Sequence, residues 1–221
     1  MNSIYTIPLT DVFETIGGCP FCRLKKMLDD RAVAYISGAA MMEPEIRIET
    51  NKKGFCPDHF AKLYKNPNRL SLALILETHL DEIENKVFKG DIAKNAAAAA
   101  KSCYICEKVD GAFEKMAVNT VIEYEKNPAF KEMFLKQAFF CLEHLALLLA
   151  LSQSKHRRPT ARDFSERILK IEKAHLARLK ETVNAFTRLF DYNADKRNAQ
   201  NPEIKEAVAN AISFVSRGLD F

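Results

Sequence analysis

Hydrophobic residues recur every three to four positions along most of the chain, which is the spacing of an amphipathic α-helix. Leu72, Leu76 and Leu80, for example, share one face of a helix expected from about Arg69 to Lys89. Alternating runs of β-branched residues, which would indicate strands, do not extend beyond four residues. The pattern therefore predicts an all-α protein.

Proline and glycine divide this helical pattern into separate elements. Proline suits the first position of a helix, whereas glycine commonly follows the last one. Five alanines within residues 95–101 are expected either to form a flexible link between two halves or to lead into the next helix. The helices expected span about residues 20–37, 44–53, a short segment from 57, 69–89, 104–126, 128–137, 142–151, a long segment from 159 to 190, and 203–217.

All six cysteines belong to one motif that occurs twice, a Cys-x2-Cys pair followed by a Cys-x2-His pair. The corresponding positions of the two copies are 84 or 85 residues apart, and no cysteine is left over, which indicates an internal duplication. The eight positions are Cys19, Cys22, Cys56 and His59 in the first copy, and Cys103, Cys106, Cys141 and His144 in the second.

This spacing has a chemical reason. Residues three apart at the start of a helix lie on one face and can bind one ion together, and the helix N-terminus favours thiolate. Two such pairs supply the tetrahedral Cys3His set that zinc prefers, so we expect two structural zinc ions. Buried inert cysteines, a redox dithiol and an iron–sulfur cluster are the alternatives to zinc.

The duplication allows two ways of pairing the motifs. Each copy can close its own site, or the halves can exchange, so that Cys19 and Cys22 join Cys141 and His144. Closing 33 residues rather than 118 favours the local arrangement by only about 1 kcal/mol. A duplicated unit would once have folded alone, however, and we therefore expect local closure.

The expected domains follow from this interpretation. Residues 1–94 form a first helical metal-binding module, residues 95–192 a second, homologous one, and residues 193–221 a C-terminal helical extension. Each module is expected to be tied together by its own Cys3His site, since a domain of this size gains much from a metal cross-link.

Charge is uneven along the chain, which has a formal net charge of +4. Residues 151–221 hold 14 basic and 9 acidic side chains. Four basic residues gather there at Lys155, Arg157, Arg158 and Arg162. They are a candidate surface for an acidic protein or a nucleic acid.

Other sequence features point to a non-enzymatic, cytoplasmic protein without membrane spans. The first residues lack the basic region and apolar core of a secretory signal, and no apolar run approaches the ~20 residues that cross a bilayer. No catalytic residue set is present. Glu172-x2-His175 matches half of a carboxylate di-metal motif, but we assign it to a solvated helix face because the other half is missing.

Several segments resemble a bacterial family known mainly from anaerobic Firmicutes, which carries a domain of unknown function, DUF6062. The resemblance lies in YTIP at 5–8, CPFC at 19–22, EPEIRIETNKKGFCPDH at 43–59 and NRLSLALILETHL at 68–80. It implies a helical protein with duplicated cysteine pairs and supplies no activity. The residues themselves favour a binding or adaptor protein with two structural zinc sites. A sensor, carrier or iron–sulfur protein with functional thiolates is the alternative.

Overall fold

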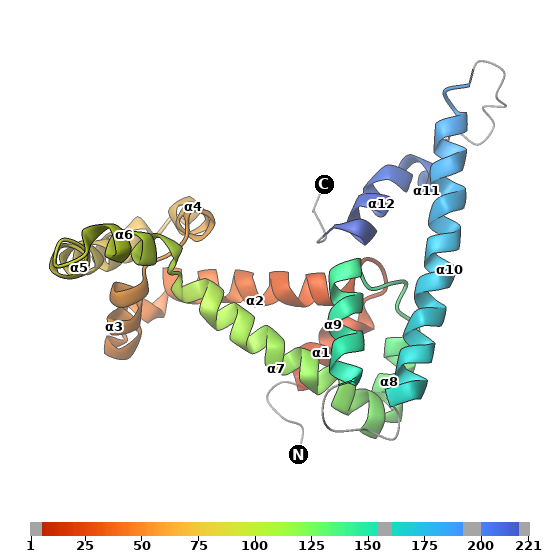
Figure 1. Cartoon of the computed structure of the whole chain (residues 1–221), viewed down its shortest axis with the longest axis horizontal. Coiled ribbons are helices and arrows are strands. Elements are labelled where there is room, and N and C mark those ends of the chain that lie inside the picture. Colours follow the sequence, from red (N-terminus) through yellow and green to blue (C-terminus); the bar gives the residue numbers. More distant parts are fainter. Residues whose placement is uncertain (1–5, 154–160, 192–199, 217–221) are drawn as a thin grey trace. The chain divides into compact units, whose positions relative to one another are not determined.

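The computed structural model describes residues 6–153, 161–191 and 200–216, and this part of the chain contains helices and no strand (Figure 1). The all-α prediction is confirmed. None of the described helices is both long and apolar enough to cross a bilayer. The elements are α1 (Thr6–Glu14), α2 (Pro20–Ser37), the 3-10 helix η1 (Ala39–Met42), α3 (Pro44–Lys53), α4 (Pro57–Lys65), α5 (Arg69–Val87), α6 (Ile92–Lys101), α7 (Tyr104–Lys126), α8 (Pro128–Leu135), α9 (Leu142–Ser152), α10 (Ala161–Arg188), α11 (Pro202–Lys205) and α12 (Ala207–Val215).

Proline fixes the first residue of five of these helices, namely α2, α3, α4, α8 and α11. The expected starts at Pro20, Pro44 and Pro57 are therefore confirmed. Three elements were not anticipated. These are α1, near the N-terminus, the 3-10 helix η1, and α6, which includes the alanine-rich segment and ends at Lys101 before the extended residue Ser102. The helix expected over 203–217 is divided into α11 and α12.

The chain forms two compact units, and the first is built from two separate segments of the chain. The first unit comprises residues 1–24 and 115–221, and the second comprises residues 25–114. Both α2 and α7 begin in one unit and end in the other. Residue 94, the expected end of the first module, lies within α6, in the second unit.

Aromatic side chains fill the core of the first unit. The Phe134 ring lies at its centre, with ring centroids 5.0 Å from Phe140, 5.2 Å from Tyr124 and 5.7 Å from Phe13. All four side chains are 0–1% exposed. Phe13 also meets Phe21, so the core reaches the first turn of α2.

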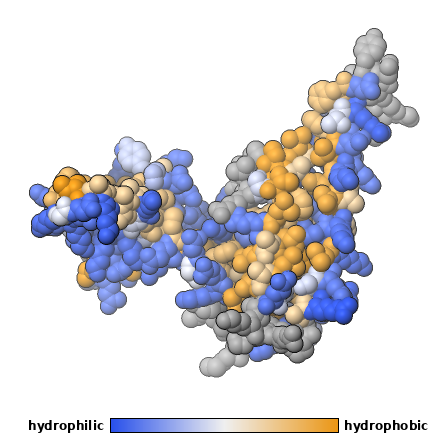
Figure 2. Space-filling view, viewed as in Figure 1, coloured by the Kyte–Doolittle hydropathy of each residue, from blue (hydrophilic) through white to orange (hydrophobic). Residues whose placement is uncertain are grey.

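The C-terminal helices α11 and α12 pack against α10. One face of α10 is buried at Phe164, Ile168, Glu172 and Leu179, which are spaced for a helix. Figure 2 shows hydrophobic residues gathered over α12 and the neighbouring side of α10, with hydrophilic residues along the other side of α10.

A turn at Gly54 organises the second unit. Its carbonyl accepts a hydrogen bond from the Tyr104 amide at 3.0 Å, so the end of α3 meets the start of α7. Gly54 has φ 59° and ψ −155°, a conformation that only glycine adopts easily. A Cβ there would also lie 2.4 Å from Nε2 of His79, whose Nδ1 donates to the Asn51 carbonyl at 2.6 Å.

We predict that Gly54→Ala destabilises the protein by about 1–3 kcal/mol, because alanine is strained at this backbone conformation and would displace His79. Gly111→Ala is the matched control. Gly111 lies within α7 with open space around it, so alanine should stabilise the helix by about 1 kcal/mol. Thermal denaturation of both variants checks this, and a lowered melting temperature for the two alike would contradict it.

Candidate metal centres

The eight predicted ligands form two sets of four. Within each set, one candidate ligand atom per residue lies within 4.8 Å of all the others. We call Cys19, Cys22, Cys141 and His144 the first site, and Cys56, His59, Cys103 and Cys106 the second site. Each site lies entirely within one unit, the first site in the first unit and the second in the second.

Four helices begin at these sites, two at each. At the first site α2 starts directly after Cys19, and α9 starts after Cys141. At the second site α4 starts after Cys56, and α7 starts after Cys103. Free N–H groups and the positive ends of the helix dipoles therefore surround the sulfur atoms and stabilise thiolate. One such contact is the hydrogen bond from the Cys106 amide to Sγ of Cys103, 3.4 Å long.

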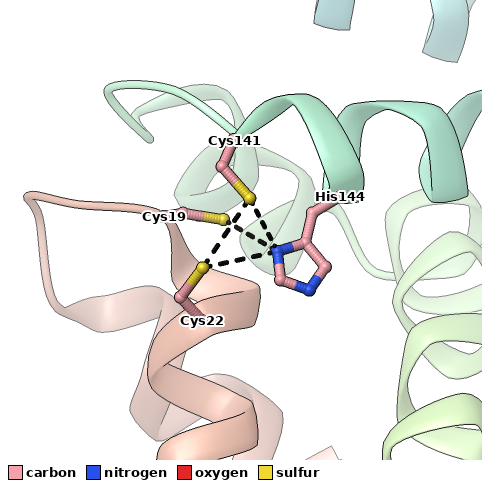
Figure 3. A group of neighbouring side chains, drawn as sticks. All are labelled: Cys19, Cys22, Cys141 and His144. Carbon is pink, nitrogen blue, oxygen red and sulfur yellow. Dashed lines mark hydrogen bonds between the residues drawn. The ribbon is translucent and has the colours of Figure 1, made fainter. Parts of the chain in front are cut away.

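At the first site, the imidazole of His144 turns its Nδ1 toward all three sulfur atoms (Figure 3). The distances are 3.0 Å to Cys141, 3.4 Å to Cys19 and 3.5 Å to Cys22. The Sγ atoms of Cys22 and Cys141 are 3.7 Å apart. Cys141 is fully buried, and Phe21 stacks on the imidazole with ring centroids 5.5 Å apart.

The second site repeats this geometry. Nδ1 of His59 lies 3.1 Å from the sulfur of Cys56, 3.3 Å from Cys103 and 3.4 Å from Cys106. The Sγ atoms of Cys56 and Cys106 are 3.8 Å apart. His59 and Cys103 are buried, while Cys56 and Cys106 are partly exposed.

These distances fit the ligands of one tetrahedral ion. Bonds of about 2.3 Å to sulfur and about 2.05 Å to nitrogen place the sulfur atoms about 3.8 Å apart and sulfur and nitrogen about 3.6 Å apart. The sulfur separations of 3.7 and 3.8 Å match the first value, and the Nδ1–sulfur distances of 3.0–3.5 Å are shorter than the second. All six cysteines are free thiols, because a disulfide requires about 2.05 Å.

The expectation of local closure is wrong, because each site combines the Cys-x2-Cys pair of one half with the Cys-x2-His pair of the other. The reason lies in α2, whose 18 residues carry the chain about 27 Å from Cys19. Phe55, next to Cys56, packs in one core with Ile36 at the far end of α2. The loop-closure free energy, which favours the local arrangement by about 1 kcal/mol, is too small to bring Cys56 back to Cys19.

The pKa values of three side chains at the first site are shifted in different directions. Burial raises the pKa of the Cys19 thiol, whereas hydrogen bonds from Cys19 and Cys22 lower that of Cys141. Burial opposes charge on His144, but hydrogen bonds to Cys141 and Cys22 outweigh it and raise its pKa to about 9. In the second site burial raises the pKa of Cys106 to about 12. A divalent cation would displace these protons and neutralise the thiolates.

Arg23 connects the first site to the surrounding loops. Its guanidinium donates to the carbonyls of Val12 at 3.1 Å and Thr15 at 2.7 Å, to the Gly17 carbonyl, and to Oε1 of Gln137 at 3.2 Å. Burial lowers its pKa, while the charges of the neighbouring thiols oppose that shift. Three thiolates around a divalent ion would leave one net negative charge, which the nearby positive charge of Arg23 would offset.

Asp29 gives the second site a different support. Its Oδ1 accepts from Nε2 of His59 at 2.7 Å, and Lys62 donates to its other oxygen. Burial opposes ionisation of Asp29, but the hydrogen bonds from Lys62 and His59 outweigh it, so its pKa lies below the usual value. A carboxylate on the second nitrogen fixes the tautomer and orientation of a metal-binding histidine. Only the ligands themselves were identified from the sequence; this contact requires the fold.

The basic residues proposed to bind a partner do not form a described surface. Lys155, Arg157 and Arg158 lie outside the residues that the structure describes. Arg162, in the first turn of α10, is exposed and donates from Nε to Glu166 at 2.8 Å. Its charge is therefore already paired.

The assignment of Glu172-x2-His175 to a solvated face is wrong. Glu172 is 5% exposed and lies on the buried face of α10. The spacing of Phe164, Ile168 and Leu179 around it was the sequence signal for this burial. The groups that face Glu172 come from a distant segment, and the sequence did not reveal them.

Comparisons with known proteins give one result. A sequence model described as "Family of unknown function (DUF6062)" matches residues 1–220. No curated protein and no solved structure matches the chain.

We predict that Cys141→Ser makes Cys19 and Cys22 reactive toward a thiol-alkylating reagent in the zinc-loaded protein, because all three belong to one site. The sulfur atoms of the second site should remain protected. Peptide mass spectrometry after a short alkylation pulse checks this. Reaction at Cys103 and Cys106 instead would mean that each half closes its own site.

We further predict that Asp29→Ala weakens metal binding at the second site by about 10–100-fold, because His59 loses the group that orients it. The first site should be unaffected. Chelator competition combined with the same alkylation pulse measures both sites in one sample. Equal weakening of the two sites would show a general loss of stability and contradict the prediction.

Proposed function

The chain belongs to the DUF6062 family of unknown function, and from the geometry of its ligand sets we propose that each site holds one structural zinc ion. The observation that carries the proposal is the convergence of three sulfur atoms and one imidazole Nδ1 within 4.8 Å of one another at both sites. Cys3His is a common ligand set of structural zinc.

The distances favour a single ion over an iron–sulfur cluster. A cluster places several iron and sulfide atoms between its ligands, so its cysteine sulfurs must lie farther apart than the ligands of one ion. Here all ligand atoms of each site lie within 4.8 Å of one another. The mixed sulfur and nitrogen ligands suit zinc, a borderline-soft ion without redox chemistry.

The closed ligand sets favour a structural role over a catalytic or redox role. Catalytic zinc keeps one position open for water or substrate, whereas four protein ligands complete each tetrahedron here. Each ion would tie together segments far apart in sequence, such as Cys22 and Cys141. We also propose that the repeat arose by duplication and that the two halves exchanged their Cys-x2-His pairs, in the manner of domain swapping.

The proposed biological role is that of a non-enzymatic binding or adaptor protein. The zinc ions would hold the helices in place, and the C-terminal third, with its excess of five positive charges, would contact an acidic partner. This part of the proposal rests on charge alone. Metal or redox handling is the rival, in which the thiolates would react or exchange their ion.

We predict that protein purified without added metal contains two zinc ions per chain and is colourless. Complete chelation should reduce the helical circular-dichroism signal and the melting temperature, because the binding free energy of a structural site is also folding free energy. Elemental analysis and thermal scans measure both effects. A brown protein that contains iron and sulfide, or unchanged stability after all metal has been removed, would overturn the proposal.

A further inference from the structure

Two polar residues interrupt the buried face of α10. Glu172 follows Phe164 and Ile168 and precedes Leu179 on this face, and all four are at most 7% exposed. His175 lies one turn after Glu172, half-buried. Among the described residues, Oε2 of Glu172 and Nε2 of His175 are buried atoms without a hydrogen-bond partner. Such burial costs free energy, so an apolar side chain would pack here more favourably.

Both residues contact the segment that leads into the first site. Oε1 of Glu172 accepts the hydrogen bond of the Phe140 amide at 2.7 Å. The imidazole of His175 stacks on Phe139, with centroids 4.2 Å apart and an interplanar angle of 14°. Phe139 and Phe140 immediately precede Cys141, the N-cap residue of α9. Glu172 and His175 therefore fix the two residues that set the position of the Cys141 sulfur.

The same segment is held on its other side by Gln137. Its Nε2 donates to the Phe13 carbonyl at 2.7 Å, and its Oε1 accepts from Arg23. The Phe140 ring packs on Phe134. The segment is thus anchored both on the Cys19–Cys22 side of the site and on α10. A ligand must be held within about 0.5 Å of its productive position, and these anchors supply that precision.

We propose that Glu172 and His175 are positioning residues of the first site, which hold the Cys141–His144 pair in metal-binding geometry and make α10 part of the metal centre. This inference rests on the proposed zinc function. The hydrogen bond to Phe140 needs an acceptor and not a charge. Burial raises the pKa of Glu172 to about 7, and Oε1 accepts the amide hydrogen in either protonation state.

The test compares variants of the zinc-loaded full-length protein. Increasing chelator is added, thiols are labelled in a short alkylation pulse, and the chelator concentration that halves protection is measured for each cysteine. Glu172→Ala should lower this concentration by about 10–100-fold for Cys19, Cys22 and Cys141 and leave the second site unchanged. Glu172→Gln retains an acceptor oxygen and should restore protection.

Two controls show whether the effect is specific. Glu181→Ala removes an exposed carboxylate from the same helix and should change neither site. Asp29→Ala should affect the second site alone, which shows that the assay resolves the two sites. If Glu172→Ala does not fold in excess zinc, His175→Ala replaces it, since this half-buried side chain can be removed at lower cost. Like Glu172→Ala, His175→Ala should weaken protection at the first site and leave the second site unchanged.

The outcomes separate the inference from the proposed function. Thiols that react equally with and without zinc in the unsubstituted protein would refute zinc binding itself. If zinc protects both sites in the unsubstituted protein but Glu172→Ala and His175→Ala behave like Glu181→Ala, only the positioning role is refuted. Equal loss of protection at both sites would also refute it, because that result indicates general destabilisation.

Discussion

The convergence of two helix N-termini on each four-ligand set is the interaction on which the rest of this structure depends. Each set collects three sulfur atoms and one imidazole from segments far apart in sequence. Thiolates in such proximity repel one another, and partial burial strengthens that repulsion. A divalent cation removes it, and the helix dipoles assist. With the proposed metal ions bound, the arrangement of helices around each site would therefore depend on metal binding.

Much of this molecule can be predicted from local sequence signals. Prolines at 20, 44 and 57 set helix starts, and three-residue spacing identified the eight residues that gather in the two four-residue sets. These features are local, since they depend on backbone geometry and on the chemistry of sulfur and imidazole. The ligand positions also follow the helix starts, because each pair begins a helix. Sequence signals that act over a few residues were thus sufficient to predict the type of site.

The pairing of the ligands could not be predicted in the same way. The spacing within each pair is identical in the local and exchanged arrangements, and loop entropy separates them by only about 1 kcal/mol. The length of α2 was predicted, but the packing of Phe55 near the far end of α2 decides the outcome, and that packing is a property of the whole fold. Glu172 was misjudged for a related reason. Its partner, the Phe140 amide, lies 32 residues away.

The exchanged pairing has a consequence for the order of events during translation. The nascent chain completes the non-native set Cys19, Cys22, Cys56 and His59 first, because all four are made before Cys103. The second site is complete at Cys106 and the first only at His144, 38 residues later. At roughly 5–20 residues per second, that delay lasts about 2–8 s. A zinc ion captured early by the wrong four ligands would thus be a kinetic trap, because two of its ligands have to be exchanged before a native site can form.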